Sequence, residues 1–121
     1  MTPVVRLHIR GREGASELAI GPGKVALLEA IARTGSITSA AKALGMSYRR
    51  AWMLVDETNR CLVTPAVETA SGGQHGGGSA LTAVGRELVK RYRALERETG
   101  VAARRTFKTL FRTTPPRAKA R

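Results

Sequence analysis

Two arginines follow a serine and a tyrosine in the run Ser47-Tyr48-Arg49-Arg50, at a point where a helix is predicted to begin. An arginine guanidinium pairs with the edge of guanine through two parallel hydrogen bonds. The free N–H groups in the first turn of a helix bind phosphate. If this helix enters the major groove of DNA, its first turn faces the base edges. These residue types in this order therefore predict a helix start that contacts DNA.

Other chemistry finds little support in the sequence. The soft metal ligands Cys61, His8 and His75 are far apart and lack the spacing of a metal site. Cys61, near the end of an apolar helix, is predicted to be a small core residue. The acids Asp56 and Glu57 are helical neighbours and point about 100° apart, so they form no catalytic pair. We expect no enzyme, no metal and no cofactor.

The contacting helix belongs to a predicted helix-turn-helix. Ser36 is expected to cap a short helix that ends at Gly45, where a positive φ permits a sharp turn. Ser47 is expected to cap the next helix, which runs to about Arg60. Tyr48 is predicted to contact phosphate or a thymine methyl group. The residues expected to turn inward are Ile37, Ala40, Ala41 and Leu44 in the first helix, and Ala51, Trp52, Leu54 and Val55 in the second. An ordinary helical hairpin is the alternative interpretation.

A candidate wing follows this motif. Val63 to Thr69 is predicted to be extended, with an interruption at Pro65, and Ala80 and Leu81 would complete a hairpin. The intervening Ser71 to Ser79 contains five glycines, which allow close approach to a phosphate backbone. A surface loop without a function is the alternative. The stretch lacks the lysine and the spacing of a nucleotide-binding loop.

The N-terminal part is predicted to form a hairpin and a helix. Residues 4–10 alternate between apolar and polar side chains, as in a half-buried strand, and a turn is expected from Gly11 to Gly14. Leu18 and Ile20 indicate the returning strand. The following helix is expected to begin at Pro22 and end at Gly35, with an apolar stripe of Val25, Leu28, Ile31 and Ala32.

A long helix capped by Thr82 is predicted near the C-terminal end. Gly100 weakens it, and Val101 to Phe111 would either continue it or form a separate helix. Its apolar stripe could pack within one subunit, but a projecting helix of this length usually keeps apolar surface for a partner. We expect a homodimer that presents two helices to successive major grooves. The expected dimer interface consists of Leu81, Val84, Leu88, Tyr92 and Leu95.

Composition and charge agree with a nucleic-acid partner. The chain has 121 residues, enough for one domain. Its net charge is +12, and 16 of its 21 basic residues are arginine. Nucleic acid is the first polyanion to consider and an anionic membrane surface the second. Residues 86–121 alone carry twelve bases and three acids. The last ten residues, from Arg112, are expected to be a disordered basic tail that is either solvated or bound to phosphates.

Two further features of the sequence indicate the cellular compartment of the protein. No apolar stretch long enough to span a membrane occurs, and the N-terminus does not resemble a signal peptide. A single cysteine excludes an intramolecular disulfide and suggests a reducing environment. We therefore expect a cytoplasmic, nucleoid-associated protein.

The run Gly35-Ser-Ile-Thr-Ser-Ala-Ala-Lys-Ala-Leu-Gly-Met-Ser-Tyr-Arg-Arg-Ala-Trp52 resembles the N-terminal winged-helix domain of ModE, a molybdate-responsive regulator family. Leu81-Thr82-x-x-Gly85, after the glycine-rich stretch, adds to the resemblance, which covers about residues 4–98; LysR-type regulators share a looser version. The resemblance implies a winged helix with an N-terminal hairpin that binds palindromic operator DNA as a dimer. The family senses molybdate or tungstate through a separate C-terminal portion, so we do not expect these residues to bind either oxyanion directly.

The expected fold class is α+β, mostly α: a winged helix-turn-helix with an N-terminal β-hairpin and a long C-terminal dimerisation helix. Residues 1–98 would form the DNA-binding domain and residues 99–121 a basic extension. The expected function is sequence-specific transcriptional regulation. The alternatives are a non-specific architectural DNA binder of the nucleoid type and a protein-interaction module. The expected DNA contacts are Ser36, Ser47, Tyr48, Arg49, Arg50, Met53, Gln74, His75 and Ser79.

Overall fold

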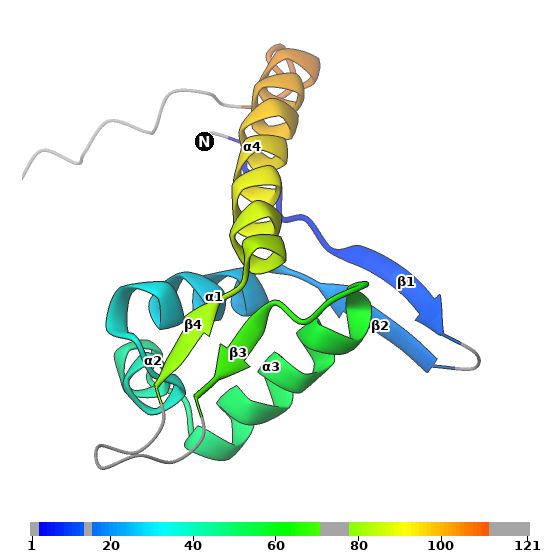
Figure 1. Ribbon diagram of the computed structural model, residues 1–121. Coiled ribbons are helices and arrows are strands. Elements are labelled where there is room, and N and C mark those ends of the chain that lie inside the picture. Colours follow the sequence, from blue (N-terminus) through cyan, green and yellow to red (C-terminus); the bar gives the residue numbers. More distant parts are fainter. Residues whose placement is uncertain (1–2, 14–15, 71–77, 112–121) are drawn as a thin grey trace, which may run out of the picture.

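The computed structural model describes residues 3–13, 16–70 and 78–111. Three helices form the body, a small β-hairpin lies at each of two sides, and a long helix projects from the body (Figure 1). This arrangement confirms the predicted winged helix-turn-helix. In chain order the elements are β1 (Ile9–Glu13), β2 (Ser16–Ile20), α1 (Pro22–Thr34), α2 (Ile37–Leu44), α3 (Tyr48–Cys61), β3 (Val67–Thr69), β4 (Ser79–Leu81) and α4 (Ala83–Thr106).

The helix boundaries follow their capping residues. α1 begins with proline in its first turn and ends at Gly35, whose φ of 80° places it in the left-handed region. The hydroxyl oxygens of Ser36 and Ser47 accept hydrogen bonds from the N–H groups of Ser39 and Arg50, at 2.9 and 3.1 Å. These caps confirm the predicted starts of α2 and α3.

The main core lies where α1, α2, α3 and the β3–β4 hairpin meet. Short alanine side chains on α2 and α3 line this core, so the two helices can pack closely. Three residues expected on inner faces are exposed instead: Ala32, Trp52 and, at 37% exposure, Leu44, the last residue of α2 before the turn at Gly45. The buried members of the core are Leu27, Leu28, Ala30, Ile31, Ile37, Ala40, Ala41, Ala51, Val55, Ala66, Val67 and Leu81.

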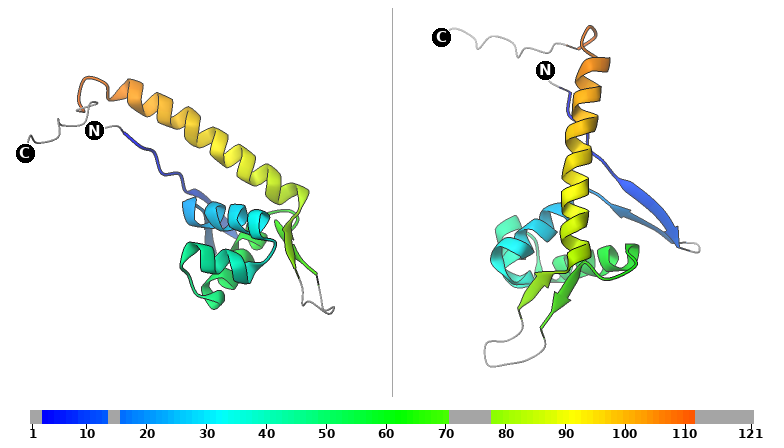
Figure 2. Two further views of the ribbon diagram at one scale, coloured as in Figure 1. Left: turned by 90° about the vertical axis from the view of Figure 1, so that its left-hand side faces the viewer. Right: turned by 45° about the horizontal axis from the view of Figure 1, so that its top comes forward.

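The N-terminal hairpin differs from the prediction by several residues. β1 pairs antiparallel with β2 from Ile9 opposite Ile20 to Glu13 opposite Ser16, so Gly11, expected in the turn, is a paired strand residue. The segment before Ile9 has no strand partner among the described residues. It runs beside α4 (Figure 2), where the Leu7 carbonyl accepts a 2.8 Å hydrogen bond from the Tyr92 hydroxyl. Its alternating pattern therefore reflects packing against a helix rather than pairing in a sheet.

α4 continues without a break through Gly100 to Thr106 and extends well beyond the three-helix body (Figure 2). The predicted cap is confirmed, because the Thr82 hydroxyl oxygen accepts a hydrogen bond from the Gly85 N–H at 3.0 Å. The domain boundary expected after residue 98 falls inside this helix and stays a prediction. The tail expected to be disordered from Arg112 lies outside the described residues.

Candidate nucleic-acid interface

The first turn of α3 presents its side chains to solvent. Gly45, with φ 67°, turns the chain between α2 and α3, and Tyr48, Arg49 and Arg50 are exposed immediately after the Ser47 cap. Neither guanidinium forms an ion pair or a hydrogen bond with any part of the chain that the structure describes. Both arginines are therefore available to an external hydrogen-bond acceptor.

The outward face of α3 combines charged and apolar groups. Ala51, Val55 and Thr58 face the core, so at about 100° per residue Arg49 and Met53 project from the opposite side. Met53 is 47% exposed. Further along this face Asp56 and Arg60 form an exposed ion pair with a nitrogen–oxygen distance of 3.8 Å. Neither Asp56 nor Arg60 belongs to the DNA contacts predicted from the sequence.

A notch of about 250 Å³ joins α2, α3 and the wing. At this end of the body the start of α3 approaches the β3–β4 hairpin (Figure 1). Three of the predicted contacts, Ser36, Tyr48 and Ser79, share this notch, whereas Arg49, Arg50 and Met53 lie outside it. The notch is lined by Ser36, Ile37, Thr38, Tyr48, Trp52, Thr69, Ala70, Gly78 and Ser79.

The prediction that Trp52 belongs to the core is wrong. Its side chain is 38% exposed and lines the notch, and it meets the Tyr48 ring edge to face at a centroid distance of 6.2 Å. Residues four apart lie on one side of a helix. Since Tyr48 was expected at the surface, this spacing already indicated a similar position for Trp52.

Backbone hydrogen bonds attach the wing to the helix-turn-helix. The Ser79 N–H donates to the Gly35 carbonyl at 2.8 Å, which links β4 to the turn between α1 and α2. On the other strand, the Asn59 side-chain oxygen accepts from the N–H groups of Ala66 and Val67, at 2.8 and 3.3 Å. The wing is thereby held at a fixed place beside α3. Asn59 was missed in the sequence, because its partners are seven and eight residues away and no local pattern marks them.

Two predicted wing contacts, Gln74 and His75, lie outside the described residues. The predicted hairpin is confirmed, with Val67 opposite Leu81 and Thr69 opposite Ser79, but the first strand begins at Val67 rather than Val63 and the second already includes Ser79. Pro65 precedes the first strand, and its carbonyl accepts a 2.7 Å hydrogen bond from the Thr82 hydroxyl.

The residues predicted for a dimer interface fall into two groups. Leu81 and Tyr92 are buried within the chain itself, so they offer no surface to a partner. Val84 and Leu88 are half-buried, and Leu95 is exposed further along α4. Val101 and Phe107 add exposed apolar surface toward the far end of the helix.

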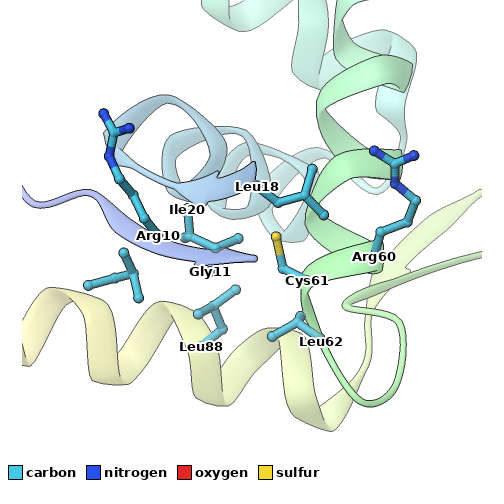
Figure 3. Close-up of a pocket in the computed structure, with 9 residues that line it drawn as sticks. Arg10, Gly11, Leu18, Ile20, Arg60, Cys61, Leu62 and Leu88 are labelled. Carbon is cyan, nitrogen blue, oxygen red and sulfur yellow. The ribbon is translucent and has the colours of Figure 1, made fainter. Parts of the chain in front are cut away.

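An apolar cavity of about 380 Å³ lies between the N-terminal hairpin, the end of α3 and α4 (Figure 3). It is lined by Leu18, Ile20, Leu62 and Leu88, together with Cys61. The Cys61 side chain also packs against the cluster of Ile20, Val25 and Tyr92.

Within the described ranges no three His, Cys, Asp or Glu side chains are grouped to hold a metal ion. No helix there is long and apolar enough to cross a membrane.

Two helices joined by a glycine turn, free arginines at the start of the second helix, and a hairpin hydrogen-bonded beside it define a winged helix-turn-helix protein. Residues 23–86 match the family described as bacterial regulatory helix-turn-helix protein, lysR family. The chain belongs to this family.

The resemblance to ModE is also confirmed. The chain is 48% identical over 83 residues to the molybdenum-pterin-binding protein MopB of Rhodobacter capsulatus, covering 69% of this chain and 30% of that protein. It is 46% identical over 80 residues to the molybdenum transport protein ModE of Azotobacter vinelandii, covering 66% and 30%. It is 41% identical over 76 residues to the DNA-binding transcriptional dual regulator ModE of Escherichia coli K12, covering 63% and 29%. The chain thus spans about a third of the length of these relatives.

Proposed function

We propose that this protein is a sequence-specific regulator of transcription that places α3 in the major groove of double-stranded DNA. The free guanidinium groups of Arg49 and Arg50 on the first turn of α3 carry the proposal, because this turn meets the base edges when such a helix enters the groove. The relative from Escherichia coli is named as a DNA-binding transcriptional regulator, which supports the same function.

The notch supplies contacts on one flank of this helix. Ser36 at the start of α2 and Ser79 at the start of β4 both line it, so their hydroxyl groups would donate hydrogen bonds to the sugar–phosphate backbone there. These contacts would set the position of α3 in the groove without selecting a base. Gln74 and His75 remain proposed contacts of the wing.

A homodimer forms part of the proposal. Val84, Leu88 and Leu95 on α4 leave apolar surface that a second copy could cover. Two-fold pairing would present two α3 helices to half-sites about 34–36 Å apart. An operator selected from random duplexes would then be palindromic.

The test is binding to a duplex selected in vitro and to a random duplex. Arg49→Ala or Arg50→Ala should weaken binding to the selected duplex by roughly tenfold to a hundredfold if the residue contacts guanine. Arg97→Ala, which removes an exposed arginine from α4, is the control of equal charge. An equal loss on both duplexes would instead indicate a phosphate contact. Unchanged binding of both α3 variants would contradict the proposed role of this helix.

A second candidate, an architectural DNA binder without sequence preference, is favoured by one observation. α4 exposes a series of basic side chains along its length, and these could contact phosphates. A selected duplex bound less than about a thousandfold more tightly than random duplex would favour this function. No duplex binding at all would favour a protein-interaction module. The exposed basic residues of α4 are Arg86, Lys90, Arg91, Arg97, Arg104 and Arg105.

Two finer expectations belong to the same proposal. Association with the nucleoid would follow from DNA binding. We also expect these 121 residues not to bind molybdate or tungstate directly. Calorimetric titration of molybdate into the purified chain tests this, and saturable binding at micromolar concentration would contradict it.

A further inference from the structure

Two large apolar side chains on α3 are exposed to solvent. Met53 is 47% exposed one helical turn after Arg49, and Trp52 beside it is 38% exposed. Single exposed apolar residues are common on protein surfaces. These two are consecutive on α3 and therefore point about 100° apart: Trp52 lines the notch beside the wing, whereas Met53 lies on the same outward face as the free guanidinium of Arg49. The position of Met53 beside a free arginine suits an apolar group within an otherwise charged groove.

The major groove of DNA offers one such group. Guanine, adenine and cytosine present hydrogen-bond donors and acceptors there, whereas thymine adds a 5-methyl group. The methionine thioether lacks a donor and packs flexibly on apolar surface. One turn of α-helix rises about 5.4 Å and one base step about 3.4 Å. If Arg49 contacts a guanine, Met53 therefore lies over a base pair one or two steps away.

We propose that Met53 binds the 5-methyl group of a thymine in the operator. The inference rests on the proposed function and deepens it, because it names the base that the apolar part of α3 selects. It does not require Met53 for folding, since half of its surface is already in water.

Replacement of thymine by uracil isolates the methyl group, because it changes nothing else in the base pair. We would select a duplex in vitro and replace its thymines with uracil one at a time. Burial of one methyl group corresponds to about a threefold to fourfold change in affinity. We expect one position in each half-site to show this loss with the unaltered protein. Met53→Ala should bind the thymine and uracil duplexes equally, as a double-mutant cycle requires for a direct contact.

Val63→Ala is the matched control, because Val63 is apolar and 98% exposed but lies in the loop after α3. This variant should keep the thymine preference. Met53→Gln keeps the side-chain length and should lose the preference, which provides a second measurement if the alanine variant unfolds. A thymine preference that persists in both Met53 variants, or is absent from the unaltered protein, would overturn the inference. A selection that enriches no sequence would instead contradict the proposed function itself.

Discussion

The Asn59 side chain joins α3 to the first wing strand. Its oxygen accepts from two backbone N–H groups, and Ala66, one of the donors, is fully buried. A buried N–H group without an acceptor costs about 1–3 kcal/mol. We expect Asn59→Ala to lower the free energy of unfolding by this amount, as measured by urea denaturation. Asn59→Asp retains an acceptor oxygen and should lose less. Equal stability of the alanine variant would show that the wing is held without this residue.

Glu29 and Arg93 connect α1 to α4 through paired hydrogen bonds of 2.6 and 3.0 Å. The hydrogen bonds from Arg93 hold the pKa of Glu29 below its usual value, against the opposing effect of partial burial. Because the lowered pKa belongs to the folded state, the stabilisation is present above the unfolded pKa and is lost as the pH falls through the folded one.

This linkage gives a prediction for pH-dependent stability. Glu29→Gln should reduce the free energy of unfolding at neutral pH by at most about 1 kcal/mol, since both side chains are a third exposed. The difference from the unaltered protein should shrink from about pH 5 downward. Urea denaturation at pH 7 and at pH 3 measures both values. A difference that grew on acidification would contradict the assigned direction of the pKa shift.

At the scale of elements, α4 begins in close contact with Ala66, the residue directly before β3. A Cβ atom added at Gly85 would collide with the carbonyl oxygen of Ala66, a backbone atom that cannot turn aside. We expect Gly85→Ala to destabilise the fold by about 1–3 kcal/mol, because the start of α4 must shift away from β3. Gly23→Ala in the first turn of α1 meets no atom within 4 Å and is the control. Thermal unfolding of both variants should separate them clearly.

The sequence was informative about elements whose limits depend on local chemistry. Ser36, Ser47 and Thr82 each cap the helix that was predicted for them, and Gly35 and Gly45 end the helices before them. Such caps depend on residues within a few positions of one another, so a single sequence reveals them.

Features that depend on distant contacts were not predictable in the same way. The segment around Leu7 alternates like a strand, yet its partner is Tyr92, 85 residues away. The apolar pattern of the helix predicts Trp52 on its inner side, but smaller side chains fill the interior and the indole is 38% exposed. The partner of Leu7 cannot be found from residues nearby in the sequence, whereas the spacing of Trp52 from Tyr48 did indicate its exposure.

At the scale of the whole molecule, the excess positive charge should act on any duplex. The last ten residues contain four basic and no acidic residues. Each neutralised phosphate contributes about −0.9 to the slope of log affinity against log salt, so deletion of residues 112–121 should flatten this slope by up to three to four units. Binding measured across a salt series on selected and random duplexes checks this. The ratio between the duplexes should stay nearly constant, and a selective loss of the selected duplex would contradict a role through charge alone.

Trp52 is the single tryptophan of the chain, and it stands partly in water between α3 and the wing. Its emission therefore reports on one place alone, without any added label. A duplex bound through α3 would displace water from the indole and change its fluorescence. A duplex bound only by the basic side chains of α4 would leave the fluorescence nearly unaltered. The protein thus contains an optical probe that separates occupation of the groove-binding helix from general attraction to DNA.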